Sequence, residues 1–211
     1  MTAPTVSTTG RSRVRTPSET RFGSRRRNPQ YGRFPAACRP LAWIPEVHHP
    51  IGIGEAVIPD ALLYYRRGPV DGDNGSMPRV FVEVDRATMG PECLAAKLTA
   101  YERVYRYVPV VPGRRPTLQE PAVEEWRWRY PLFPRVLFVL DGTGPAGVEN
   151  RISALRAGAG LLAPYRFPYD VTVLAALLTD LLHHGPSTPV WRPVHDPDQR
   201  VPWTGSGHRS T

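Results

Sequence analysis

The sequence predicts an α/β domain built as a mixed sheet flanked by helices, because strand-like and helix-like segments alternate along its middle part. Runs of β-branched and aromatic residues stand between turn-rich segments, which is typical of strands. Other segments carry apolar residues at helical spacing. Val136–Leu140 is entirely apolar, as expected of a strand buried on both faces.

The first elements form a predicted hairpin followed by a helix. Val57–Tyr65 and Arg79–Arg86 have strand composition, and Gly68–Pro78 between them is dense in turn residues. Pro91–Val108 then predicts a helix, with proline and Glu92 in its first turn, where both are favourable.

A proline-rich loop separates this part from the second half. The further elements predicted are the strand Val136–Leu140, helices over Val148–Ala163 and Asp170–His184, and a short strand over Val190–Val194. Gly185 and Pro186 mark the end of the last helix.

Positive charge is concentrated at the N-terminus. The chain has 211 residues and a formal net charge of +8, and residues 1–40 hold nine arginines and one acid. Because residues 1–40 lack apolar periodicity, we expect a disordered arm, a domain over 41–194 and an irregular tail over 195–211. Arg25, Arg26 and Arg27 are expected to bind DNA phosphates, although a merely solvated tail or an organelle transit peptide has a similar composition.

Composition also excludes several classes of protein. No apolar run approaches the roughly 20 residues of a membrane span, and the start of the chain lacks a secretory signal pattern. The two cysteines, Cys38 and Cys93, can form neither a disulfide framework nor a CxxC zinc site. We therefore expect a cytoplasmic protein without membrane contact.

Two carboxylates lie on one face of the strand Arg79–Arg86. Side chains alternate along a strand, so Glu83 and Asp85 share a face with Phe81, roughly 6.6 Å apart along the backbone. Since Phe81 indicates that this face is covered, the carboxylates need partners there.

Lys97 is the expected partner. It is the only lysine beside 26 arginines, and it falls within the apolar stripe of the helix that follows the strand. A buried ammonium needs a counter-charge, so Lys97 should meet Glu83 or Asp85. Lysine provides a compact charge with an adjustable pKa, which the arginine fork does not. A purely structural ion pair is the alternative.

Asp60 completes the candidate site, because the hairpin brings it beside Glu83. Two or three carboxylates without cysteine suit a hard cation such as Mg²⁺ or Mn²⁺. Together with a lysine, such a cation supports phosphodiester hydrolysis.

Several segments resemble the replication-relaxation proteins of actinobacterial plasmids and integrative elements, whose nuclease-like half is similar to the PD-(D/E)XK fold. They are PDALLYY, FVEVDRAT, KLTAY, PRVLFVLDG and ENRISALRAGA, and the resemblance spans about Leu41–Val194. Its most specific part is Glu83-Val84-Asp85-Arg86 with Thr88, Lys97 and Tyr101. Trp43 and Glu46 resemble the strand that precedes the Pro-Asp pair.

The resemblance implies roles for these residues. Asp60 and Glu83 would bind the metal and Asp85 would assist as a further ligand. Lys97 would replace the usual lysine, whose place Asp85 takes, and Tyr101 would orient it. Apart from these implied roles, Arg86 is expected to contact DNA. The family's winged-helix region has no counterpart here, because the arginine-rich segment occupies its place.

The remaining motifs have simpler interpretations. His48-His49 and His183-His184 are adjacent pairs, which do not share a metal readily. The stretch Trp126–Tyr130 alternates aromatic residues with arginine, as in single-strand-binding surfaces or a packed hairpin arm. Cys93 is expected to be a small buried helix residue, and Asp141–Gly144 a turn.

The sequence thus predicts a metal-dependent DNA nuclease-like protein of plasmid or mobile-element replication. Replication or mobilisation proteins are its expected partners, and the oligomeric state is left open. The alternative is a catalytically inactive DNA-binding or assembly module with the same fold.

Overall fold

The structure is a computed structural model that describes residues 38–52, 54–67, 77–110 and 123–205, all within one compact unit. The predicted arm spans residues 1–40, and residues 1–37 of it, with Arg25, Arg26 and Arg27, lie outside the described residues, as does most of the predicted hairpin loop. Residues 38–40 are not disordered as predicted, because they begin a strand of the domain. Among the described residues, no helix combines the length and apolarity that a membrane crossing requires.

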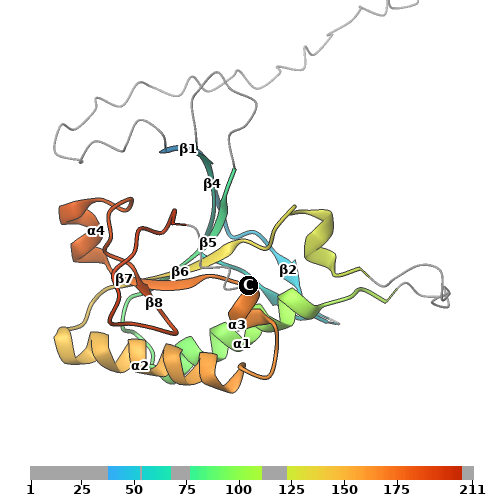
Figure 1. Cartoon of the computed structure of the whole chain (residues 1–211). Coiled ribbons are helices and arrows are strands. Elements are labelled where there is room, and N and C mark those ends of the chain that lie inside the picture. Colours follow the sequence, from blue (N-terminus) through green and yellow to red (C-terminus); the bar gives the residue numbers. More distant parts are fainter. Residues whose placement is uncertain (1–37, 53, 68–76, 111–122, 206–211) are drawn as a thin grey trace, which may run out of the picture. The chain divides into compact units, whose positions relative to one another are not determined.

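A six-stranded mixed sheet forms the centre of the domain, in the order β1-β4-β5-β6-β7-β8 (Figure 1). The strands are β1 (Cys38–Pro45), β4 (Ala61–Arg67), β5 (Arg79–Asp85), β6 (Arg135–Leu140), β7 (Val173–Leu177) and β8 (Arg192–Pro193). β5, β6 and β7 are parallel, and the other pairs are antiparallel. A separate ribbon pairs β2 (His49–Pro50) with β3 (Ala56–Val57). The predicted α/β mixed sheet is therefore confirmed, as is the β4–β5 pairing.

Two helices, α1 (Glu92–Arg106) and α2 (Pro145–Leu161), cover one face of the sheet (Figure 1). They follow β5 and β6, because parallel neighbours need crossover connections. The helices approach closely at Gly158, where an added Cβ would lie 3.0 Å from the Cβ of Ala95. Phe81, Phe138 and Leu98 belong to the apolar core between sheet and helices.

The opposite face is covered by α4 (Leu178–His184) and by the C-terminal segment. Trp203 is only 1% exposed and packs edge-on against Tyr65, with ring centroids 4.6 Å apart. Arg135, the first residue of β6, donates to the Trp203 carbonyl. The tail expected to be irregular thus forms part of the core as far as Trp203. Within its described residues, 195–205, an isolated bridge joins Val201 to Trp191.

The strand Val136–Leu140 and the helices over Pro91–Val108 and Val148–Ala163 are confirmed as β6, α1 and α2, with ends shifted by a few residues. The predicted strand Val57–Tyr65 is interrupted between β3 and β4. Pro59 lies in the interruption, and its nitrogen cannot donate to a ladder.

The helix predicted over Asp170–His184 is wrong. The structure has a short helix α3 (Phe167–Asp170), then β7, then α4. Val173–Ala176 are buried between β6 and β8, and a short apolar run buried on all sides has no periodicity that separates strand from helix. The tertiary position of this run therefore decides its structure.

The aromatic stretch Trp126–Tyr130 forms a short 3-10 helix, η1 (Glu125–Trp128), and not the hairpin arm considered above. Trp126 is buried, stacks on Tyr105 at 5.7 Å and donates its Nε1 proton to the Tyr105 carbonyl at 2.9 Å. Trp128 is exposed, so nucleic-acid contact by this stretch stays a prediction.

Candidate functional site

Glu83 is the centre of the candidate site. It lies near the end of β5 on the face covered by α1, and it is 2% exposed. Lys97 donates to its Oε2, and the Tyr101 hydroxyl donates to its Oε1 at 2.6 Å. Lys97 and Tyr101 are one helical turn apart, so a single face of α1 supplies both donors. The predicted meeting of Lys97 with a β5 carboxylate is confirmed.

Burial dominates the electrostatics of this group. Removal from water raises the pKa of Glu83 above its usual value, while the hydrogen bonds from Lys97 and Tyr101 oppose this effect. The Asp60 carboxylate adds to the increase by repulsion. Burial, and then the negative charge of Glu83, raise the pKa of Tyr101 well above its usual value, so its phenol stays protonated and acts as a donor.

Asp60 lies in the turn just before β4. Because Ala61 pairs with Val82, continuing the same antiparallel register places Asp60 beside Glu83. Its Oδ2 accepts a hydrogen bond from the Val84 amide at 2.7 Å, and the residue is exposed. Asp60 is therefore a solvent-facing carboxylate next to a buried one.

Asp85 has a different partner. Arg151 of α2 donates from Nε to Asp85 Oδ2, and the two side chains are 8% and 10% exposed. Asp85 Oδ1 accepts from the Ala87 amide at 3.1 Å. Both oxygens of Asp85 are thus engaged within the protein.

Arg151 is not among the site residues predicted from the sequence. The available signal was the one that identified Lys97: Arg151 falls between Val148 and Leu155 on the apolar stripe of its helix, where a cation requires a buried counter-charge.

A pocket of about 90 Å³ adjoins these groups. Its wall includes Glu83, Asp85, Arg86 and Lys97. Other lining residues are Val84, Thr88, Met89, Gly90, Cys93 and Leu94. Of the four residues of the predicted site, Glu83, Asp85 and Lys97 line this pocket, whereas Asp60 lies outside its lining. Lys97 is 38% exposed, so its ammonium reaches both Glu83 and the open side.

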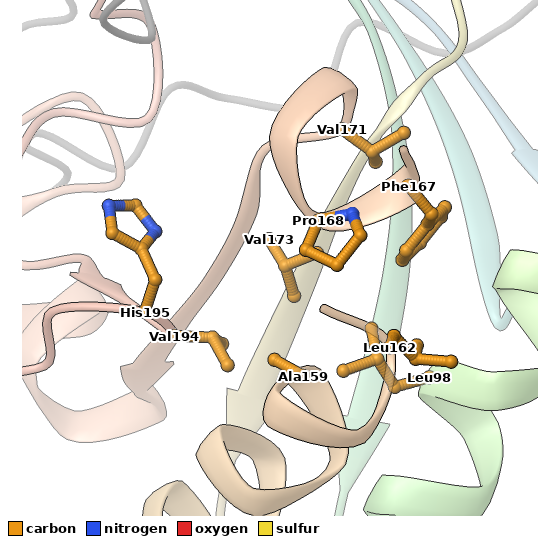
Figure 2. Close-up of a pocket in the computed structure, with 9 residues that line it drawn as sticks. All are labelled: Leu98, Ala159, Leu162, Phe167, Pro168, Val171, Val173, Val194 and His195. Atoms are coloured by element: carbon orange, nitrogen blue, oxygen red, sulfur yellow. The ribbon is translucent and has the colours of Figure 1, made fainter. Parts of the chain in front are cut away.

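A second cavity lies between α1, α2 and α3 and has a different character. Figure 2 shows Leu98, Leu162 and Phe167 turned toward one another, with the ring of His195 to one side. Its volume of about 20 Å³ is close to the space that one water needs. It is too small and apolar to be a substrate site.

The histidine pairs do not contribute to the candidate site. His49 is 2% exposed; its Nδ1 donates to the Val47 carbonyl at 2.8 Å, and its Nε2 accepts from the Tyr130 hydroxyl at 2.7 Å. Burial lowers the pKa of His49 to about 4, so the ring is neutral near pH 7. His183 and His184 are exposed, with ring centroids 6.3 Å apart.

A model of the replication-relaxation family matches residues 18–116. The match supports the assignment of the chain to this family. It spans just under half of the chain and includes β1, β4, β5 and α1, hence Asp60, Glu83, Asp85, Lys97 and Tyr101. The resemblance beyond residue 116, as far as Val194, stays a prediction. No curated protein and no solved structure matches the chain.

Proposed function

We propose that this chain is a metal-dependent DNA nuclease-like protein that acts in the replication or relaxation of a plasmid or other mobile element. The observation that carries the proposal is the position of Lys97. The only lysine of the chain donates to a buried glutamate at the wall of a pocket, and it remains partly open to solvent. Perturbed ionisable groups beside a pocket are typical of functional sites.

The order of the elements supports a PD-(D/E)XK-like centre. Asp60, from the Pro-Asp pair, precedes β4, and Glu83 lies on the adjacent β5. α1 follows directly and supplies Lys97 from a helix instead of from β5. The family match over residues 18–116 covers all three residues.

The residues fit a divalent cation that arrives with its substrate. Among residues 38–52, 54–67, 77–110 and 123–205 no group of three or more histidine, cysteine, aspartate or glutamate residues could hold a metal ion by itself. Mg²⁺, however, is often bound by one or two carboxylates plus substrate phosphates. Asp60 and Glu83 would hold Mg²⁺ or Mn²⁺, and Asp85 would join them only after leaving Arg151. Such an ion supplies charge stabilisation for phosphodiester hydrolysis.

The protein's own groups would act as follows. Lys97 and Tyr101 keep the Glu83 carboxylate in one orientation through its two oxygens. The Lys97 ammonium at the pocket stabilises negative charge that develops on a phosphate. Arg86, exposed at the pocket wall, binds a neighbouring phosphate of the DNA.

A plasmid-nicking assay tests this proposal. The full chain is incubated with supercoiled DNA in Mg²⁺, in Mn²⁺ or in chelator. We expect cleavage with metal only, and we expect Lys97→Arg to abolish it while the circular dichroism spectrum is unchanged, because arginine keeps the charge but not the compact geometry. If Lys97→Arg cleaves DNA at the wild-type rate, the role of Lys97 is only structural.

One observation favours a second candidate function, an inactive DNA-binding or assembly module. Every carboxylate oxygen of Glu83 and Asp85 already has a partner within the protein. Titration with Mn²⁺, followed by electron paramagnetic resonance, separates the two candidates. A nuclease centre binds Mn²⁺ and loses it in Asp60→Asn, whereas the inactive module binds none in either form.

A further inference from the structure

We propose that Arg151 and Asp85 are positioning residues that hold the segment Arg86–Gly90 in a fixed shape, so that Arg86 binds a phosphate of the DNA backbone. This inference rests on the proposed DNA substrate. It gives Asp85 a role different from that of a metal ligand, and it gives α2, which lies outside the family match, a part in substrate binding.

Arg151 ties both ends of this segment together. Its Nε donates to Asp85 Oδ2 before the segment, and its Nη2 donates to the Met89 carbonyl within it at 3.1 Å. A third contact joins its Nη1 to the Gly147 carbonyl at 3.4 Å. Because a guanidinium is planar and rigid, these bonds fix the distance between β5 and the start of α1.

The segment held in this way has a strained backbone. Ala87 has φ +57°, a left-handed conformation that costs a residue with a Cβ about 1 kcal/mol. Its amide donates to Asp85 Oδ1, on the carboxylate that Arg151 holds. Gly142 allows the next loop to approach, since an added Cβ there would lie 2.7 Å from the Arg86 carbonyl. Strain of this kind persists only where the surroundings determine the conformation.

The fixed segment presents polar groups to the pocket. Arg86 and Thr88 are exposed and line the same wall as Lys97. Asp85 would otherwise neutralise Arg86 next to it, but its charge is already compensated by Arg151. Arg86 is therefore free to bind an anion, and the phosphate diester is the ligand that its fork fits.

Fluorescence anisotropy with a labelled DNA duplex, in chelator to prevent cleavage, tests the inference with the full chain. We expect Arg86→Ala to weaken binding roughly tenfold and to lower the salt dependence by about one phosphate contact. Arg151→Met should produce the same two changes, although its side chain is buried. The double variant should bind no worse than either single variant, because both act on one contact.

Arg156→Met, an exposed arginine on the same helix, is the matched control and should bind like the wild type. If Arg151→Met fails to fold, Asp85→Asn tests the same link, because it removes the charge pair and keeps the volume. Wild-type affinity in either link variant, or additive losses in the double variant, would overturn the inference. Absence of DNA binding by the wild type overturns it together with the DNA substrate. Binding in this assay, combined with no cleavage in the plasmid-nicking assay with metal, contradicts only the nuclease activity.

Discussion

A polar side chain is buried beside each half of β5, but one is neutral and the other is charged. Near Phe81, the neutral ring of His49 lies edge-on to the phenyl group at 4.7 Å and is satisfied by Val47 and Tyr130. Near the other end, Glu83 is equally buried but is held by the ammonium of Lys97 beside a pocket.

The difference separates structural from functional burial. A neutral, fully bonded pair such as His49 and Tyr130 fills the core without needing solvent or ligand. An ion pair that keeps one partner at a pocket retains a charge that a ligand can use. The buried groups at both ends of β5 have hydrogen-bond partners, so hydrogen bonding does not distinguish them. They differ in the charge of the Glu83–Lys97 pair and in the pocket that adjoins it.

The largest expected effect is on cleavage. Glu83→Gln should lower the nicking rate on the order of 10³-fold, about 4 kcal/mol, because the amide cannot replace the carboxylate that Lys97 and Tyr101 orient. Tyr130→Phe at the other end of β5 should leave the rate unchanged. Equal losses in both variants, measured at matched folded fraction, would remove the distinction between the two ends.

The next effect concerns acid stability. The pKa of His49 is about 4 in the folded protein against an ordinary 6.5, so the unfolded chain binds the additional proton between these values. Stability therefore falls as the pH decreases from 6.5 to 4, by about 3 kcal/mol for this group. Urea unfolding across this range measures the slope. His49→Gln should flatten it, and the exposed His48→Gln should not.

Glu83 should act with the opposite sign. Its raised pKa means that the folded protein holds the proton to higher pH than the unfolded chain, so this group lowers stability as the pH rises above its ordinary value. Because the two slopes partly cancel in the wild type, Glu83→Gln should steepen the increase of stability with pH. Urea unfolding of Glu83→Gln across the same pH range as His49→Gln measures this slope. A shallower increase of stability with pH in Glu83→Gln would contradict the raised pKa of Glu83.

The smallest effects concern the helix pair that carries Lys97 and Arg151. Gly158→Ala should destabilise the protein by about 1 kcal/mol, because its methyl group meets Ala95 in a closely packed contact. Gly160→Ala, with no neighbour within 4 Å of its added Cβ, should stabilise it by about 0.5 kcal/mol through helix propensity. Thermal unfolding of both variants provides the comparison, and stabilisation by Gly158→Ala would show that the helices adjust freely.

Local sequence patterns predicted that Lys97 lies beside Glu83 and Asp85, but they did not predict the contact between Asp85 and Arg151. Strand alternation placed Glu83 and Asp85 on one face, and the helical stripe turned Lys97 toward them. Both patterns act over short distances in the sequence. Arg151 is sixty-six residues from Asp85, and only the parallel arrangement of β5 and β6, with α2 packed on α1, brings it there. Sequence periodicity could indicate that Arg151 is buried, but not which carboxylate it meets.

The misassigned segment after Asp170 has a related cause. Val173–Leu178 is entirely apolar, so helical and extended structures bury a similar surface. Pairing with β6 selects the extended form, because the buried backbone groups on that side of β6 need partners, and β7 supplies them. The short helix begins only at Leu178, beyond that ladder.

The burial of Trp203 has a consequence for how the protein is made. Its ring completes the second face of the sheet together with Tyr65 and Trp191, and it comes from the last residues of the described chain. A nascent chain on the ribosome exposes that face until this tryptophan has left the exit tunnel. The second face of the sheet is therefore completed only after the chain has been synthesised beyond Trp203, and a polypeptide that stops before this tryptophan has an open, aggregation-prone sheet.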